Sequence, residues 1–452
     1  MGSHSAPVNS IEVLFNTSPF AYTCLSDATR SLGMISSALP LTIKDSTLMR
    51  ILVITDKPLT SLSSGHNLRV WHLCRELAKR HEMYLLTINL GCPDKFRDGP
   101  IALSEVFKKT DDAPALPVHR PSLKRHFRRN ESTYYFLSYP CYFSMATKAI
   151  ADMCEQNSIS HMIVFNLDLA GFVRPFSSNK KILFDVGDSL ALTLTREMRF
   201  LPVWPVHKYL KAHLALARIA KAEACLPHWF SHVTTINGAD TDTLIRLSGK
   251  STNISTVPNG VSADRAETFD ASDHITKRRG VAFWGNLAFK PNTDAVRFFY
   301  EKVYRPYLAP AGIEWCVVGR DAERWLQEEA QRDRGIRLTG FVEDIHSVLI
   351  EYPIMVNPMR IGSGLKNKVL EAFAMGLAVV STGLGVEAIS AAGEGVDYIR
   401  ADEPSRMASA IKLLIEDERL RLSMIKSARK VVLERYTWNR VAGELDALLC
   451  SL

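Results

Sequence analysis

The chain has 452 residues, of which 46% are hydrophobic and 23% charged, so the sequence predicts a soluble globular protein of two or three domains. No apolar stretch approaches the roughly 18 residues of a membrane-spanning helix, there is no basic-then-apolar leader, and the eight cysteines form no C-x-x-C pair. These features predict reduced thiols, no metal site and a cytoplasmic location. The formal net charge of +7 favours an anionic partner such as a nucleotide, an acidic lipid or nucleic acid.

Residues 1–48 show no clear periodic pattern, and we assign them to an extension of unknown role. From Met49 the run "MRILVITD" predicts a buried strand, "LRVWHLCRELAKR" has apolar residues at helical spacing, and "EMYLLTINL" predicts a second strand. This unit opens a Rossmann-like domain that we place at 49–257. Its further expected elements are strands at 161–166, 181–186 and 232–237 and a long helix at 206–226.

The stretch "STVPNGV" (255–261) predicts a hinge, because Pro258 and Gly260 end the preceding pattern. The alternation of strands and helices then restarts, which predicts a second Rossmann-like domain at 258–427 and a C-terminal helix at 428–452. The expected fold class is therefore α/β, with two domains in tandem. The strand-like runs of the second domain are "GVAFWGN", "EWCVVGR", "IRLTGFV", "PIMVNP" and "AVVSTG".

The segment "RIGSGLKNKVLEAFAMG" (360–376) follows the last-but-one of these strands and indicates an anion site at a helix start. We expect the glycines to lead directly into a helix that ends near Met375, with Gly364, Lys368 and Glu371 on one face and Glu371 about 10 Å along the axis. That separation suits a diphosphate and the ribose of the same nucleotide. The alternative is that the glycines only shape a turn and the lysines lie in solvent; the strand-turn-helix context favours the anion. The helix residues expected to face the core are Val369, Leu370, Ala372 and Phe373.

In this context the chain resembles the GT-B glycosyltransferases of retaining family 4, especially members with the pattern R-x-G-x-G-x-K-x-K-x-L-E-A-x-A-x-G. The resemblance spans most of 49–445 and includes "VPNGV", "FWGNLAFKPNTDAVRFF", "VVGR", "TGFVED", "VVSTGLGVEAI" and "RYTWNRVAGEL". It implies two Rossmann-like domains facing across a cleft, with the last helix crossing back onto the N-terminal domain. It also implies transfer of a sugar from a UDP- or GDP-linked donor to a glycan or lipid-linked acceptor, with retention of configuration and without a metal or other cofactor.

The resemblance also implies roles for particular residues. The C-terminal domain would bind the donor, with Glu371 on the ribose and Phe341 and Val342 beside the base. Asp344 could either belong to this site or merely cap the next helix. The full set of donor-binding residues is Gly65, Asn286, Lys290, Phe341, Val342, Arg360, Gly362, Ser363, Gly364, Leu365, Lys366, Lys368 and Glu371.

Three positions depart from the family pattern: Asn286 replaces an arginine, Ser363 a glutamate and Gly187 a histidine. The catalytic candidates are Asp188, Lys290 and Ser363, and the candidates on the acceptor side are His66, Arg69, Asp185 and Asp188. Two alternatives stay open: a nucleotide-sugar 2-epimerase, because that class shares the fold, and a catalytically degenerate partner subunit, which the three departures favour. The "DTD" at 240–242 is interpreted as a helix cap instead of a metal site.

The segment 119–143 combines five basic residues with a run of aromatic ones, in "HRPSLKRHFRRN" and "STYYFLSYPCYF". Such a combination predicts peripheral contact with the anionic inner face of a membrane that carries the acceptor. A solvated helix face is an equal alternative, and no nucleic acid is expected.

Overall fold

The computed structural model describes residues 48–60, 62, 64–90, 102–114, 116, 134–199, 206–262, 279–362 and 364–452. The N-terminal extension up to residue 47, the basic part of segment 119–143 and Ser363 therefore lie outside the described residues. Within the described ranges, no helix combines the length and the apolarity needed to span a membrane.

The N-terminal half is built on a parallel sheet with the order β3-β2-β1-β4-β5-β6-β7. The interior strand β1 is buried on both faces, which explains the unbroken apolar run "ILVI": Ile51 pairs with Met83 on one side and with His161 on the other. The order reverses between β1 and β4, the point where ligands collect in open α/β sheets. The strands are β1 (Arg50–Thr55), β2 (Glu82–Thr87), β3 (Phe107–Asp112), β4 (His161–Phe165), β5 (Lys181–Gly187), β6 (His232–Thr235) and β7 (Ile254–Thr256).

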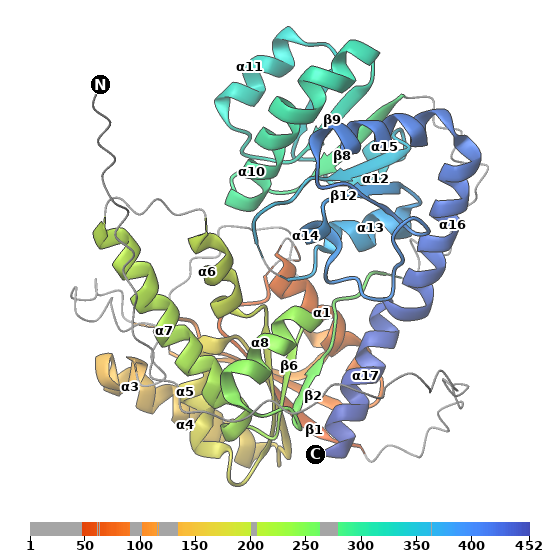
Figure 1. Ribbon diagram of the computed structural model, residues 1–452. Helices are drawn as coiled ribbons and strands as arrows, with labels where there is room; N and C mark the ends of the chain where they lie inside the picture. The colour runs from red at the N-terminus through yellow and green to blue at the C-terminus, as the bar shows by residue number, and fades with distance from the viewer. Residues whose placement is uncertain are drawn as a thin grey trace, which may run out of the picture. The chain divides into compact units, whose positions relative to one another are not determined.

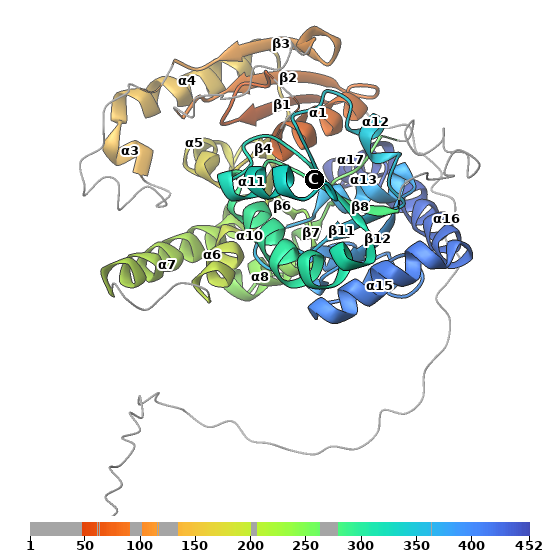
Figure 2. The ribbon, with the colours of Figure 1, turned by 90° about the horizontal axis from the view of Figure 1, so that it is seen from above.

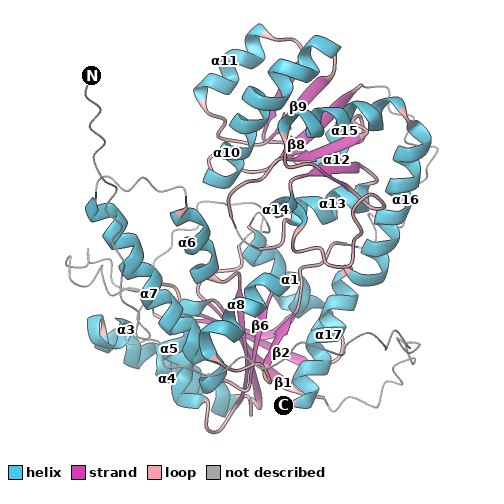
Figure 3. Cartoon of the chain, viewed as in Figure 1, coloured by secondary structure: helices cyan, strands magenta, loops and turns pink. Residues whose placement is uncertain are grey.

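Helices cover both faces of this sheet, as Figure 3 shows for the strands in magenta. The longest begins at Val206, as the sequence predicts, and continues to Trp229. The helices are α1 (Gly65–Leu77), α3 (Tyr134–Ser138), α4 (Pro140–Gln156), α5 (Ala170–Val173), α6 (Leu190–Met198), α7 (Val206–Trp229) and α8 (Gly238–Ser248).

The C-terminal half repeats the arrangement with a second parallel sheet, in the order β10-β9-β8-β11-β12-β13. Its strands are β8 (Gly280–Trp284), β9 (Glu314–Val318), β10 (Ile336–Gly340), β11 (Ile354–Asn357), β12 (Ala378–Ser381) and β13 (Ile399–Arg400). Its helices are α10 (Lys290–Phe299), continued by a π-helical stretch (Tyr300–Leu308), α11 (Arg324–Arg332), α12 (Ile345–Leu349), α13 (Asn367–Met375), α14 (Gly383–Val386), α15 (Pro404–Glu416) and α16 (Glu418–Arg435). The predicted α/β fold of two Rossmann-like halves is confirmed.

The last helix, α17 (Trp438–Ser451), leaves the C-terminal half and packs beside α1 (Figures 1 and 2). The Trp438 indole stacks on the His72 ring at 4.8 Å, and the Asp446 carboxylate lies 2.7 Å from both Arg80 and His81. Its apolar face belongs to the same core as Ile51 and Val53 of β1 and Leu73 of α1. The expected crossing of the last helix is therefore confirmed, and it begins at Trp438, after α16 has ended at Arg435.

The chain passes between the two halves at two adjacent points. The backbone of Val261, just after β7, pairs with that of Tyr436 (N to O, 2.8 Å) and Trp438 (O to N, 3.2 Å). A side chain on Gly260 would meet the Trp438 ring at 2.8 Å, so only glycine lets the two connections lie this close. The stretch predicted as a hinge is thus one of two adjacent connections between the halves, and the other is the segment between α16 and α17.

Candidate functional site

A cavity of about 580 Å³ lies at the carboxyl ends of the strands where both sheets face each other. Its walls come from both halves of the chain. The predicted site residues that line it are Gly65, His66, Arg69, Asp185, Asp188 and Leu365. Five candidates from two separate segments of the N-terminal half, together with a residue of the 360–376 segment, therefore meet in one place, as expected for a site at two topological switch points.

The glycine segment between β11 and α13, residues 358–366, forms the donor loop. Gly362 (φ 109°) and Gly364 (φ 76°) have backbone conformations that favour glycine. Because Gly364 is left-handed, it cannot be part of a right-handed helix, and α13 begins only at Asn367. The expected helix start at Gly364 is therefore wrong. Glu371 lies about 6 Å into the helix, not 10 Å, while the expected core residues from Val369 to Phe373 are fully buried.

The two lysines of this segment are oriented by specific contacts. The Lys368 ammonium donates to Asn292 Oδ1 at 2.8 Å and lies 4.1 Å above the Phe283 ring. Burial lowers its pKa to about 7, against the opposing effect of Glu371. Lys366 donates to the Gly364 carbonyl at 3.0 Å, and burial lowers its pKa too. Two lysines whose charged forms are disfavoured by burial thus lie at the start of α13, where free N–H groups already favour an anion.

Glu371 follows Lys368 by one helical turn and accepts a hydrogen bond from the Trp284 indole at 3.0 Å. Gly285, next to this tryptophan, has a φ of 148°, and a side chain there would meet Asn292 at 2.7 Å and Lys368 at 3.2 Å. The end of β8 and the first turns of α13 are therefore packed tightly together, with a carboxylate and an ammonium held about one turn apart.

Other predicted donor residues lie away from the cavity. The Asn286 side chain accepts from the Ala288 amide at 3.0 Å, so it shapes its own loop, and Lys290 is exposed at the start of α10. Arg360 turns towards α10, with its guanidinium 2.7 Å from Asp294 and 4.3 Å from the Phe298 ring centre.

At the end of β10, Phe341 is 64% exposed and Val342 is partly buried. Asp344 caps α12 by accepting from the His346 amide at 3.1 Å. Of the two roles considered for Asp344, the structure therefore shows the helix cap.

Two acceptor-side candidates form a buried ion pair. Asp185 accepts from the Arg69 guanidinium at 2.6 Å and from the Thr234 hydroxyl at 2.8 Å. The same guanidinium donates to Asn259 at 2.9 Å, and Asn259 donates to Asn367 Oδ1 at 2.9 Å. This chain of contacts connects the first sheet, through the hinge stretch, to the first residue of α13, so Arg69 and Asp185 hold the two walls of the cavity together.

Asp188 follows β5 and lies directly against the donor loop. A side chain on Gly364 would meet the Asp188 carboxylate at 2.0 Å. The Asp188 Oδ1 atom is buried and has no hydrogen-bond partner among the residues that the structure describes. Burial raises the pKa of this carboxyl group, while Lys366 and Arg69 oppose the shift. A buried carboxyl with a free oxygen, facing the loop from the opposite half, is suited to contact a reacting group.

Two buried carboxylates that the sequence analysis did not assign to the site fix the start of α6 behind Asp188. Asp240 accepts from the Ser189 amide at 3.1 Å, while Glu223 accepts from the Ser189 hydroxyl at 2.7 Å and from the Ala191 amide at 3.2 Å. Burial raises the pKa of Asp240 to about 7. The expected helix cap is partly correct, since Asp240 and the N-cap Asn237 of α8 bond each other, but Asp240 also reaches a second helix.

His66 lies in the first turn of α1, with Nε2 3.5 Å from Asp56 Oδ1. Asp56 follows β1, and its other oxygen accepts from Asn166 at 2.8 Å. Burial lowers the pKa of His66, which Asp56 opposes. The sequence analysis missed Asp56 and Asn166, although a carboxylate directly after the first strand of the sheet was a usable signal.

Comparison with known protein families finds a match for part of the C-terminal half. Residues 278–417 match the family described as "Glycosyl transferases group 1". No curated protein sequence is significantly similar to the chain.

Three solved structures illustrate the likeness in fold. Anabaena HepE in complex with UDP is 14% identical, with 89% of this chain and 100% of that chain covered and a TM-score of 0.59. Sucrose-phosphate synthase from Thermosynechococcus elongatus is 13% identical (88% and 98% covered, TM-score 0.61), and TarM, a protein of S. aureus, is 12% identical (90% and 100% covered, TM-score 0.64).

Residues 278–417, which contain the donor loop and α13, thus form a group 1 glycosyl transferase domain within a chain that has the GT-B fold. The match of this stretch to the family agrees with the resemblance found in the sequence, and the solved structures show that the fold is shared.

Proposed function

We propose that the protein transfers a sugar from a UDP- or GDP-linked donor to a glycan or lipid-linked acceptor, with retention of configuration and without a metal ion. The observation that carries the proposal is the first turn of α13. It places Lys368 and Glu371 one turn apart, beside a glycine loop that faces the buried carboxyl of Asp188. Anabaena HepE, which shares the fold, has structures with UDP and with UDP-glucose, and this favours UDP as the nucleotide.

In this proposal the donor diphosphate binds at Gly362, Gly364 and Leu365 and the start of α13. Departure of the nucleotide places negative charge on the β-phosphate, which the free N–H groups of α13 and the ammonium groups of Lys366 and Lys368 stabilise. A bound diphosphate favours the charged form of Lys368 and raises its pKa from about 7. Ser363 and Lys290 complete the proposed set of groups around the phosphates and the transferred sugar, with Arg360 and Asn286 at its edge.

Glu371 accepts the ribose hydroxyl groups, and Phe341 and Val342 flank the base. The exposed face of Phe341 is available for stacking. On the opposite wall, Gly65, His66 and Asp188 contact the transferred sugar and the acceptor hydroxyl. Arg69 and Asp185 keep these groups in position, because their contacts link the two walls of the cavity.

In this proposal, segment 119–143 makes a peripheral contact with the inner face of a membrane. The part of this segment that the structure describes carries exposed apolar side chains, since Phe136 and Leu137 are 54% and 56% exposed. Met145, on the next helix, is also exposed. Apolar side chains beside a basic segment suit an anionic lipid surface.

The proposal is tested by incubating the protein with radiolabelled UDP-glucose and GDP-mannose, each with and without a membrane lipid extract. Release of the nucleotide that depends on the extract, with label in the lipid fraction, supports transfer. Formation of an isomeric nucleotide sugar without acceptor would instead indicate the epimerase. Binding of UDP and GDP, measured by thermal shift, separates both outcomes from a partner subunit that has lost the donor site.

A further inference from the structure

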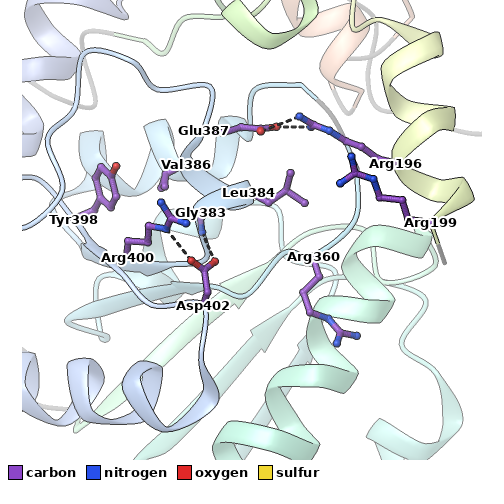
Figure 4. A pocket seen from close by; sticks show the side chains of 10 residues that line it. All are labelled: Arg196, Arg199, Arg360, Gly383, Leu384, Val386, Glu387, Tyr398, Arg400 and Asp402. Atoms are coloured by element: carbon purple, nitrogen blue, oxygen red, sulfur yellow. Dashed lines mark hydrogen bonds and ion pairs between the residues drawn. The ribbon is translucent and has the colours of Figure 1, made fainter.

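A second cavity, of about 530 Å³, lies beside the donor loop, between α6 of the N-terminal half and the segment after β12 (Figure 4). Four of its lining residues are arginines, against two carboxylates. It borders the first site, because Arg196 of α6 donates to the Gly362 carbonyl of the donor loop at 3.3 Å. The α6 helix therefore contacts the donor loop twice, through Asp188 just before its start and through Arg196 in its last turn.

Two of the arginines are held in fixed positions at opposite sides of this cavity. Arg196 binds both oxygens of Glu387, one of them at 2.9 Å. Arg400 donates through Nε to Asp402 at 2.8 Å, and the other Asp402 oxygen accepts from the Gly383 amide at 2.8 Å. A side chain on Gly383 would meet the Arg400 guanidinium at 2.7 Å. The absence of that side chain is what lets Arg400 lie flat on the backbone, with its two terminal nitrogens making no hydrogen bond to the residues that the structure describes.

Arg199 stands one turn after Arg196 and has no ion-pair partner in the described part of the chain. The fourth arginine, Arg360, turns out of the cavity to Asp294, as Figure 4 shows for its side chain. Like charges one turn apart on a helix repel each other by a few tenths of a kcal/mol. With Arg196 and Arg400 each matched to one carboxylate, Arg199 leaves the cavity with an unbalanced positive charge.

Apolar surface lies between these arginines. Leu384 projects into the middle of the cavity, and Val386 and Tyr398 line it next to Arg400 (Figure 4). A ligand that presents both an apolar face and an anionic group matches this lining. A sugar ring has such a face on its C–H side, and phosphate, sulfate or carboxylate on the ring would reach the guanidinium groups, which bind these anions in a bidentate manner.

We infer that this cavity binds an anionic sugar of the acceptor. This inference rests on the proposed function. Arg196 lies six residues after Leu190 along α6, which corresponds to about 9 Å. When the hydroxyl of an acceptor lies at Asp188, an anionic group on the neighbouring part of the acceptor therefore reaches Arg196 and Arg199. The acceptor is therefore an acidic saccharide, and the arginine cavity selects it over a neutral one.

The experiment measures binding of fondaparinux, a sulfated pentasaccharide, by calorimetry in the presence of saturating UDP, with neutral maltopentaose as the matched ligand. We expect the wild-type protein to bind fondaparinux and not maltopentaose. Arg199→Ala and Gly383→Ala, which displaces Arg400 without changing the charge, should each weaken binding at least tenfold. The control Arg324→Ala removes an arginine of α11 whose side chain is 91% exposed, and should leave binding unchanged.

The proposal is overturned if Arg199→Ala binds fondaparinux as the wild type does, or if Arg324→Ala weakens binding equally. It is also overturned if UDP binds but fondaparinux does not. A wild-type protein that fails to bind UDP and GDP contradicts the proposed function instead. Competition by glucose 6-phosphate or by glucuronate supports the proposal and tells phosphate from carboxylate, whereas equal competition by glucose contradicts it.

Discussion

The two sheets have the same strand order around their first strand, yet their carboxyl ends carry opposite chemistry. In the C-terminal half, two glycines with positive φ and two lysines surround the start of α13. In the N-terminal half, the ends of β1 and β5 carry the carboxylates of Asp56, Asp185 and Asp188. Topology therefore determines where a site lies, and the residues at the strand ends determine whether that wall attracts a diphosphate or a sugar hydroxyl.

The largest expected effect is on the ion pair that joins the two walls. Asp185→Ala leaves the buried Arg69 without its partner and should lower the free energy of unfolding by about 3–5 kcal/mol. Urea-induced unfolding followed by tryptophan fluorescence measures this loss. The matched variant Thr234→Val removes only a hydroxyl bond to the same carboxylate and should cost about 1 kcal/mol. Equal losses in the two variants would show that the ion pair does not join the walls.

The next effect tests the donor wall. Glu371→Ala should weaken UDP binding by about 1.5–3 kcal/mol, because the ribose hydroxyl groups lose their hydrogen bonds to a charged carboxylate. Calorimetry with UDP and 2′-deoxy-UDP measures it: the wild-type protein should prefer UDP, and the variant should not distinguish the two. Glu328→Ala, on exposed α11, serves as the control. A variant that still prefers UDP would place the ribose elsewhere.

The contact between the walls is tested at Gly364. Gly364→Ala should lower the free energy of unfolding by about 1–2 kcal/mol, because alanine disfavours the left-handed backbone. A further loss is expected because the new methyl group displaces the Asp188 carboxylate. Gly395→Ala carries only the backbone cost, since its φ is 78° and no atom lies within 4 Å of the added carbon. The difference in unfolding free energy isolates the contact with Asp188, and no difference would argue against it.

The smallest effect concerns Lys368. Its lowered pKa of about 7 means that the free site loses its charge above that pH, whereas the bound diphosphate keeps the lysine protonated. UDP affinity should therefore be full below pH 7 and fall by at most about tenfold per pH unit above it. Calorimetry between pH 6.5 and 9 measures the slope. Lys368→Met should bind weakly without this dependence, and a slope that survives in the variant would assign the proton to another group.

Most buried strands were predictable, because a parallel strand that is covered on both faces reads as an unbroken apolar run. β3 was missed since it is an edge strand in which only Phe107 is buried, and β7 because it has three residues. The start of α13 was misplaced because the sequence does not reveal whether a glycine takes a positive φ. In the hinge, the close approach of Gly260 to Trp438 could not be read from the sequence either.

Several residues of the site could be predicted because they lie at the end of a strand or soon after it. Asp185 near the end of β5, Asp188 just after it and the glycines of the donor loop after β11 belong to this group. Glu223 could not be predicted, because it lies in the middle of a helix rich in alanine and lysine and only tertiary packing brings it to Ser189. The turn of Arg360 towards Asp294, 66 residues away in the sequence, is equally invisible without the fold.

The docking of α17 has a consequence for how the protein is made. One face of the N-terminal sheet is completed by Trp438, Val441, Leu445 and Leu449, which are the last apolar residues of that core to be synthesised. During translation the N-terminal half therefore keeps this face open while the entire second half is produced, a period in which chaperones and aggregation compete for it. The N-terminal half therefore completes this face of its sheet only after the fourteen-residue helix α17 has left the ribosome.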